Sequence, residues 1–200
     1  MKTLSSTDPA APAATRSRRT PKERPGPVGG KRDGNRQRRT KGLSDAGLRL
    51  FLTHGIELVT IDDIVREAGV AKGSFYRYFE DKADLVDALV GPLNTRVCEA
   101  FAACDRALAV VRPGEPAESL MGPYMTLAMA LTQLVLEDAD VIRLYLQESR
   151  APAVGARLPI ANLARGVREG AIALATAALH HQLVRGIDPR IVATAVVGAV

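Results

Sequence analysis

The sequence predicts an all-α protein, with a tri-helical unit near the N-terminus followed by a helical bundle. Apolar residues recur at helical spacing in several long runs, and no long stretch shows the period of two that marks strands. Glycine and proline positions separate these runs. The chain has 200 residues, 46% of them hydrophobic, which is enough to bury the core of one large domain or two small ones.

The first 33 residues carry five prolines, three glycines and no apolar periodicity, which predicts a disordered basic arm rather than a domain. Residues 1–41 hold twelve Lys and Arg against three Asp and Glu, a net charge of +9, whereas the rest of the chain has a net charge of −4. This asymmetry predicts a polyanionic partner, either nucleic acid or an anionic membrane. The alternative is a solvated tail that only aids solubility.

Two helices are expected next, at about 38–53 and 61–68. The first ends near Gly55, because glycine adopts a positive φ without a Cβ clash. Thr60 can cap the second helix, and the acids at 62 and 63 suit the positive end of its dipole. The core-facing residues of the second helix are expected to be Ile61, Ile64, Val65 and Ala68.

Gly69 breaks the second helix after barely two turns, and a third helix is expected at 71–79. The fourth opens near Lys82 and is expected to reach about 104, with a bend near 91–92. Further helices are expected at 118–136, 139–148, 160–184 and from Pro189 onward.

Two short helices joined by a tight turn, after a longer helix, are typical of a helix-turn-helix. On the third helix Phe75 and Phe79 lie four residues apart, so they share a face that can anchor the helix on a core. The remaining face offers cations, a ring with a hydroxyl and a bare backbone: Lys72, Gly73, Tyr76 and Arg77.

Such a face suits the major groove of DNA. Lys, Arg and Tyr can donate to base edges or phosphates. Gly73 lets the backbone approach DNA closely, because it has no side chain. Glycine at this position destabilises the helix by about 1 kcal/mol. Lys82 is expected near amides that favour a phosphate. The alternative is an ordinary helical hairpin with solvated basic residues, but the short helices, the turn and the paired aromatics together favour DNA.

The stretch from Thr60 to Leu85 resembles the DNA-binding signature of TetR-type (TetR/AcrR-like) transcriptional regulators. The resemblance rests on Lys82 and on four residue pairs, which are Gly69-Val70, Lys72-Gly73, Phe75-Tyr76 and Tyr78-Phe79. It implies a helix-turn-helix DNA-binding domain at 34–85, a helical ligand-sensing and dimerisation domain at 86–200, and a homodimer built from the last two long helices.

By matching position, the resemblance also implies DNA contacts for individual residues. The residues expected to contact phosphates are Thr60, Ser74, Tyr78 and Lys82. The residues expected to contact base edges are Lys72, Gly73 and Tyr76. The family usually has Ser or Thr where this chain has Ala71, and losing that cap costs roughly 1 kcal/mol locally. Position 78 is often His in relatives, and Tyr can still donate to a phosphate.

The second half carries weaker patterns. Tyr124, Met125, Met129 and Gln133 follow helical spacing, with Tyr145 on the next helix. Apolar residues with a few polar tips suit a small-molecule pocket, and ordinary core packing explains them equally well.

Dimerisation is suggested by two segments with small apolar side chains. The alanine-rich residues 171–179 and the apolar residues 191–200 favour a two-fold helical-bundle dimer. The chain stops at Val200 within an apolar run, which favours truncation or burial in a partner.

Catalysis and metal binding are not expected. Cys98 and Cys104 match no zinc motif and are expected to be buried or half-buried thiols in a reducing cytoplasm, with a redox-sensing pair as the alternative. His180 and His181 point about 100° apart on a helix and cannot share a metal. Residues 118–200 show no nucleophile with a base and no glycine-rich phosphate loop. The sequence shows no signal peptide and no membrane span, so it predicts a soluble cytoplasmic protein without a cofactor.

The leading hypothesis is a sequence-specific repressor that binds a palindromic operator in double-stranded DNA as a homodimer and is released by a small-molecule effector. A second hypothesis is an architectural DNA-binding protein of the same fold without an effector. The third, an enzyme on a helical scaffold, lacks a plausible catalytic group.

Overall fold

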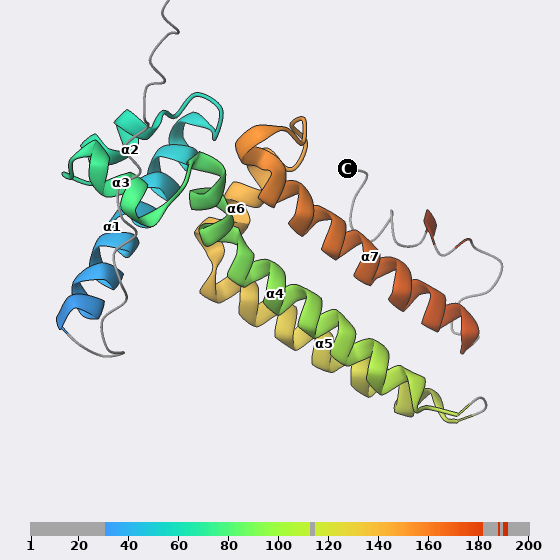
Figure 1. Ribbon diagram of the computed structural model, residues 1–200. Helices are drawn as coiled ribbons and strands as arrows, with labels where there is room; N and C mark the ends of the chain where they lie inside the picture. The colour runs from blue at the N-terminus through green and yellow to red at the C-terminus, as the bar shows by residue number, and fades with distance from the viewer. Residues whose placement is uncertain (1–30, 113–114, 182–187, 189, 192–200) are drawn as a thin grey trace, which may run out of the picture.

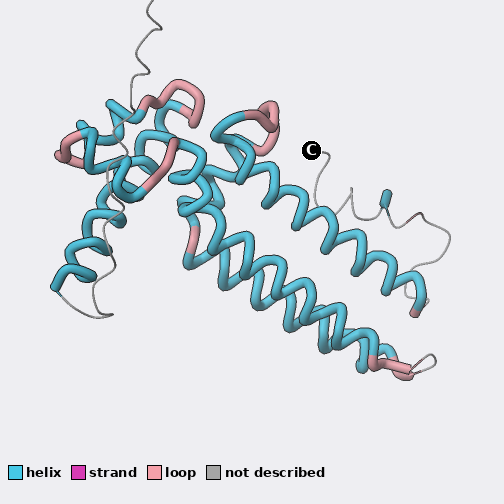
Figure 2. Tube along the Cα trace, in the orientation of Figure 1, coloured by secondary structure: helices cyan, strands magenta, loops and turns pink. Residues whose placement is uncertain are grey.

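The computed structural model describes residues 31–112, 115–181, 188 and 190–191 (Figures 1 and 2). In chain order its helices are α1 (Lys31–His54), α2 (Ile61–Glu67), α3 (Lys72–Tyr78), α4 (Lys82–Ala109), α5 (Ala117–Glu137), α6 (Ala139–Glu148), the short 3-10 helix η1 (Gly155–Arg157) and α7 (Leu158–His180). No strand occurs in this part of the chain, and the all-α prediction is confirmed.

The helices form two regions. Helices α1, α2 and α3 gather at one end as the tri-helical unit, while α4, α5 and α7 run side by side away from it (Figure 1). Helix α6 lies where the two regions meet and packs on α1 as well as on α4 and α5.

Helix α1 begins earlier than its apolar pattern predicts. It starts at Lys31 rather than near 38, so its first three turns carry basic residues and no apolar face. Extending an existing helix costs little, because nucleation is the unfavourable step and Lys, Arg and Gln are good helix formers. The last residues of the predicted arm therefore belong to α1, and residues 1–30 lie outside the described part.

The local signals for α1 and α2 are confirmed. Gly55 has a φ of 80° directly after α1. Helix α2 ends at Glu67 with Ala68 as its C-cap. Of the four residues expected to face the core, Ile64 and Val65 are buried and Ile61 and Ala68 are partly buried against the same cluster.

The core of the tri-helical unit extends beyond it. Phe51 and Phe75 are fully buried there, and they share one cluster with Leu85 of α4, Leu144 of α6 and Ile160 of α7. Helix α4 runs unbroken through the position where the sequence suggests a domain boundary, between 85 and 86. Its first turns therefore complete the N-terminal core, and the rest of α4 belongs to the bundle.

The bundle is centred on α4, which packs most extensively on α7 and next on α5. Helix α4 includes Pro92 and ends at Ala109 rather than near 104, and α7 ends at His180. The helix expected from Pro189 onward lies almost wholly outside the described residues. Within α7 the alanine-rich segment is packed inward in part, since Ala171, Leu174 and Ala175 are buried.

The two thiols differ from expectation in one respect. Cys104 is buried in the bundle, as predicted, but Cys98 is exposed on α4. Burial raises the pKa of the Cys104 thiol, which makes that group less reactive rather than more.

Candidate nucleic-acid interface

Helix α2 is fixed at its start by a complete capping box. The Thr60 hydroxyl accepts a hydrogen bond from the Asp63 amide at 3.2 Å, and the Asp63 carboxylate accepts one from the Thr60 amide at 3.1 Å. The hydrogen bonds from the Thr60 side chain and backbone hold the pKa of Asp63 below its usual value. Because the Thr60 hydroxyl also donates to Asp63, its predicted phosphate contact requires it to change partner.

The turn between α2 and α3 depends on Gly69, whose φ is +65°. A residue with a side chain adopts this left-handed conformation only at a cost, so glycine suits the position. The Val70 amide donates to the Val65 carbonyl at 3.0 Å, which closes the turn and sends the chain into α3.

Helix α3 is anchored by the two phenylalanines that the sequence singles out. Phe75 is fully buried and Phe79 is 4% exposed, with ring centroids 5.5 Å apart. Ala71 precedes the helix and provides no side-chain cap, in agreement with the departure noted in the sequence. Packing of the aromatic pair, rather than capping, therefore holds this two-turn helix in place.

The opposite side of α3 is exposed and is called here the α3 face: Lys72, Gly73, Tyr76 and Arg77. Tyr76 is 50% exposed, and its ring meets Phe75 edge to face, which limits its rotation. Ser74 and Tyr78 are half-buried at the margins of this face. The structure thus brings together six of the eight residues predicted to contact DNA.

Gly73 has no packing reason to be glycine. It lies within the helix, and a Cβ built there meets nothing within 4 Å. Glycine at such a position destabilises a helix by about 1 kcal/mol relative to alanine. The absence of a side chain at position 73 is therefore consistent with a partner that approaches the α3 backbone closely.

The α3 face carries its own counter-charge. The Lys72 ammonium lies 2.8 Å from the carboxylate of Asp62 on α2, and both side chains are more than half exposed. The hydrogen bond and the charge of Asp62 raise the pKa of Lys72. Lys72 is therefore fully protonated near neutral pH, and a phosphate or base edge must compete with Asp62 for it.

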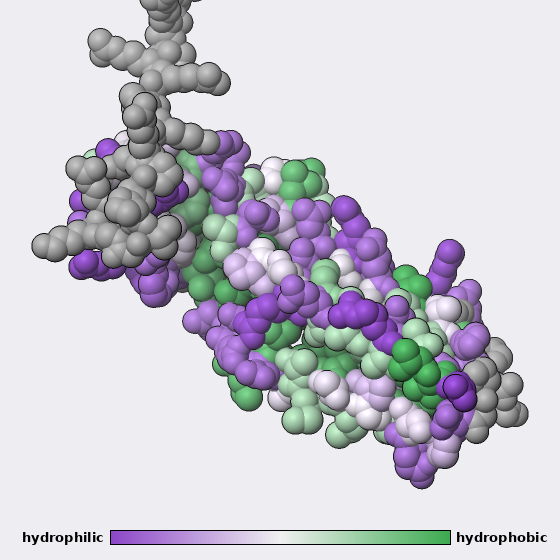
Figure 3. Space-filling view, turned by 60° about the horizontal axis from the view of Figure 1, so that its bottom comes forward, coloured by the Kyte–Doolittle hydropathy of each residue, from purple (hydrophilic) through white to green (hydrophobic). Residues whose placement is uncertain are grey.

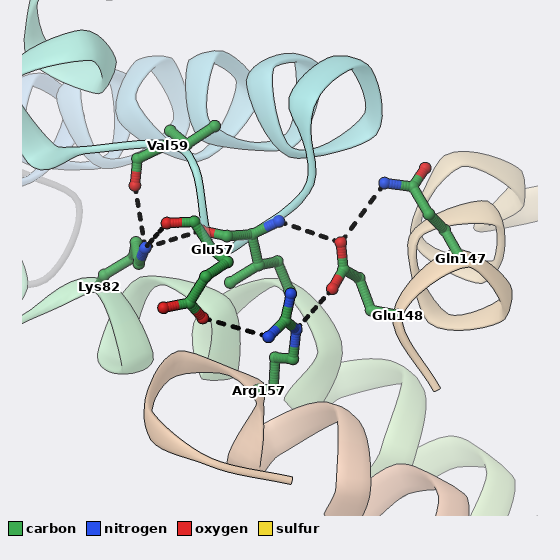
Figure 4. Close-up of polar contacts among 7 residues, drawn as sticks. Glu57, Val59, Lys82, Gln147, Glu148 and Arg157 are labelled. Atoms are coloured by element: carbon green, nitrogen blue, oxygen red, sulfur yellow. Dashed lines mark hydrogen bonds and ion pairs between the residues drawn. The ribbon is translucent and has the colours of Figure 1, made fainter. Parts of the chain in front are cut away.

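Lys82 is placed differently from the other predicted contacts. Its ammonium donates to the backbone carbonyls of Ile56 at 2.7 Å, Glu57 at 3.2 Å and Val59 at 2.9 Å (Figure 4). Burial lowers the pKa of Lys82. All three donors are thus used to hold the loop between α1 and α2, and the phosphate contact stays a prediction that needs at least one of them released.

The first turns of α1 add a second basic surface. Arg36, Arg38, Arg39 and Lys41 are all exposed on it. Arg38 donates to the Gly34 carbonyl at 3.3 Å, and Lys41 pairs with Asp45 at 2.9 Å. Exposed pairs of this kind are worth at most about 1 kcal/mol, so these cations can exchange partners readily.

Residues 43–89 match the family model of the bacterial regulatory proteins of the tetR family. The match includes the whole of α2, the turn and α3, together with most of α1's buried part and the start of α4.

The helix-turn-helix domain of this chain is a TetR-family domain.

Relatives of the TetR-type domain agree with this assignment. The transcriptional regulator AcuR of Cereibacter sphaeroides is 43% identical over 53 residues, which are 26% of this chain and 24% of AcuR. The chain thus matches about a quarter of the length of the first curated relatives, so the resemblance in sequence is confined to a short segment.

Similarity of structure extends past the TetR-type domain into the bundle. NalD, the secondary repressor of the MexAB-OprM multidrug efflux pump in Pseudomonas aeruginosa, aligns with a TM-score of 0.55 at 18% identity over 82% of this chain and 80% of NalD. AibR, solved in complex with isovaleryl coenzyme A and operator DNA, aligns with a TM-score of 0.52 at 17% identity over 78% and 80%. At these identities the likeness shows a shared fold.

Outside the TetR-type domain, the five residues proposed for a ligand pocket do not converge. Met125 and Met129 are 56% and 69% exposed on α5. Gln133 is also exposed and donates to Glu137 at 2.7 Å. Tyr124 packs between α4, α5 and α7 and donates to the Leu174 carbonyl at 3.2 Å, whereas Tyr145 packs near the other end of the bundle.

Helix α5 presents an unusual amount of apolar surface. Met121 is 52% exposed and Leu136 is 77% exposed, and hydrophobic patches interrupt the hydrophilic surface along the long helices in Figure 3. By length and composition alone, Glu118–Glu137 could cross a membrane, with a mean hydropathy of 1.3. One such helix is weak support for insertion. Among the described residues, no group of three or more His, Cys, Asp or Glu could hold a metal ion.

Proposed function

We propose that this protein is a homodimeric, sequence-specific transcriptional regulator, a repressor that a small-molecule effector releases from its operator. The observation that carries the proposal is the α3 face. It offers two cations, a tyrosine hydroxyl and a bare backbone on a helix whose buried side is locked by Phe75 and Phe79. These are the groups that read base edges and phosphates in a major groove.

Each protomer presents one such short helix, which reads only a few base pairs. Two copies related by a two-fold axis would read a palindrome whose half-sites are one helical turn or more apart. The exposed apolar surface of α5 supports self-association, since a monomer rarely leaves so much apolar surface in water. Light scattering after size exclusion should give twice the chain mass, and a monomer at micromolar concentration would overturn the dimer.

Repression and effector release are supported by fold alone. NalD is a repressor, and AibR was solved with both a small molecule and operator DNA. An effector that changes the separation of the two α3 helices would shift the dimer between DNA-competent and DNA-incompetent states.

The test is selection of bound duplexes from a random DNA pool with the full chain. A palindromic consensus is expected, because dimer symmetry is copied in the site. Enrichment no better than random competitor would overturn the proposal. Lys72→Ala should weaken binding to the selected duplex and relax its sequence preference, whereas Arg143→Ala, an exposed arginine on α6, should change neither.

An effector-independent architectural protein is the second candidate. It is favoured by one observation, namely that the predicted pocket residues either point outward or are used in core packing. Such a protein should bind random DNA nearly as well as any selected duplex, and no member of a panel of apolar small molecules should both raise its melting temperature and release the duplex.

A further inference from the structure

The loop of residues 55–59 between α1 and α2 is held by side chains from three other elements (Figure 4). Lys82, at the start of α4, binds three of its carbonyls. Glu148 at the end of α6 and Arg157 in η1 also bond to the loop. Because this loop leads directly into Thr60 and α2, whatever fixes the loop also fixes the helix-turn-helix.

Glu148 is the centre of these contacts. It is the one charged residue buried among those the structure describes, at 4% exposed. One carboxylate oxygen accepts the Ile56 amide at 3.0 Å, and the other accepts the Arg157 side chain at 2.7 Å. The neighbouring Gln147 donates to the Phe51 carbonyl at 3.0 Å, near the end of α1.

Gly55 leaves room for this arrangement. Its φ of +80° suits glycine, and a Cβ there would lie 3.2 Å from a carboxylate oxygen of Glu148. That distance is tighter than most Cβ contacts, so a side chain at 55 would push Glu148 away from the Ile56 amide. The backbone of the loop and the carboxylate are therefore fitted to each other.

Arg157 closes the network. Its side chain is only 17% exposed, and besides Glu148 it binds Glu57 in the loop at 3.1 Å. Figure 4 shows the guanidinium lying between the two carboxylates. Helix α6, η1 and the loop are thus joined by directional bonds between charged groups, which tolerate little change of angle.

We propose that Glu148 and Arg157 are positioning residues that fix the orientation of the helix-turn-helix on the bundle and so set the spacing between the two DNA half-sites. A buried ion pair adds little net stability compared with apolar packing, but it disfavours every arrangement in which either charge loses its partner. In a dimer held through its bundle, the angle of each tri-helical unit determines the distance between the two α3 helices. This inference rests on the proposed function.

The experiment uses the duplex selected by the wild-type protein, a set of duplexes with the half-sites moved by one or two base pairs either way, and a single half-site. Affinity for each is measured by fluorescence anisotropy for wild type, Glu148→Gln and Arg157→Met. Arg96→Met is the matched control, because Arg96 joins α4 to Glu137 and Asp138 within the bundle and does not touch the loop.

The wild type and Arg96→Met should prefer one spacing strongly. Glu148→Gln and Arg157→Met should lose at least about tenfold of that preference, with half-site affinity within about twofold of wild type. An equal loss on every duplex would show a merely structural role and overturn the inference, as would unchanged spacing preference. Circular dichroism establishes that each variant is folded.

Glu57→Gln keeps the test decisive if the buried variants fail to fold. The Glu57 side chain is 65% exposed, so the substitution removes one ion pair without leaving a cavity. A smaller loss of spacing preference in the same direction is expected, and no loss would overturn the inference. A wild-type protein that binds no duplex would overturn the proposed function. If the wild type prefers one spacing and the variants keep the same preference, only this inference is overturned.

Discussion

Lys72 is one of the residues that would change partner in the proposed complex with DNA. In the free protein its ammonium is 2.8 Å from Asp62. A phosphate or base edge offers a competing acceptor, and the Asp62 carboxylate would itself lie close to the negative DNA. In the proposed complex Asp62 would therefore act against binding in two ways, by occupying Lys72 and by repelling phosphates.

Replacing this acid should strengthen DNA binding. Asp62→Asn is expected to raise the affinity for a random-sequence duplex about two- to fivefold at low salt, since an exposed ion pair is worth about 0.3–1 kcal/mol. Fluorescence anisotropy at several salt concentrations measures this. Asp140→Asn, which removes an acid paired with Arg143 on α6, is the matched control and should have no effect. Weaker binding by Asp62→Asn would contradict this role.

Glu148 makes stability depend on pH. Burial raises its pKa, but the bonds from Arg157, the Ile56 amide and Gln147 together outweigh burial and hold the pKa below the ordinary value of 4.5. A carboxylate with a depressed folded pKa contributes stability that is fully present above its unfolded pKa. That contribution is lost as the pH falls through the folded pKa.

Glu148→Gln should therefore differ most from wild type near neutral pH. The substitution leaves Arg157 without its buried partner and is expected to lower the free energy of unfolding by up to about 3 kcal/mol. As the pH falls below about 4.5 the gap should narrow, and it should close once the pH has fallen through the lower folded pKa, where wild-type Glu148 is protonated as well. Urea unfolding at pH 7 and at successively lower pH measures the gap, and a gap that widens in acid would contradict the assignment.

At the scale of elements, α4 and α7 approach each other closely because glycines face α4. A Cβ on Gly170 would clash with the Phe101 ring, and one on Gly166 would lie 2.9 Å from the Cys98 sulfur. The two glycines are four residues apart and so share one face of α7. Without side chains there, α4 and α7 can form the most extensive helix contact in the described part of the chain.

Gly170→Ala should destabilise the bundle. Alanine gains about 1 kcal/mol in helix propensity, but displacing the Phe101 ring costs about 1–3 kcal/mol, so a net loss of roughly 1 kcal/mol is expected. Gly122→Ala is the control, since a Cβ at 122 in α5 meets nothing within 4 Å and only the propensity gain remains. The melting temperature should fall for Gly170→Ala and rise for Gly122→Ala. An equal rise for both variants would contradict the close approach of α4 and α7 at Gly170.

At the scale of the whole molecule, charge is distributed unevenly. The first 41 residues carry a net charge of +9 and the remainder −4. The structure places the last of these basic residues on the exposed first turns of α1, in the same tri-helical unit as α3. A long anionic partner that reaches α3 would therefore meet a basic surface from the same unit.

Deleting residues 1–33 should weaken DNA binding and flatten its dependence on salt. The segment holds eight Lys and Arg. Each phosphate that one of these residues neutralises makes the slope of log affinity against log salt concentration more negative by about 0.9. Deleting only residues 1–15, which hold one Lys and one Asp, is the control and should leave the slope unchanged. An unchanged slope after the longer deletion would show that the arm does not contact DNA and would favour the alternative of a tail that only aids solubility.

The helix-turn-helix is predictable from the sequence alone. Its features are local: the cap at Thr60, the positive φ at Gly69 and the aromatic pair Phe75 and Phe79 each act within a few residues, so spacing along the chain predicts them. The exposed side of α3 follows from the same periodicity. Helix ends without a local signal, such as the start of α1 at Lys31, were not predictable in this way.

How that unit is held on the bundle depends on contacts between residues far apart in the chain. Glu57 and Arg157 are 100 residues apart, and Ile56 and Glu148 are 92 apart, so no pattern along the chain indicates their contact. The same holds for the three backbone carbonyls that Lys82 binds, which lie 23 to 26 residues before it in the chain. Periodicity specifies which face of a helix is buried, but which buried charge meets which loop depends on how the helices pack.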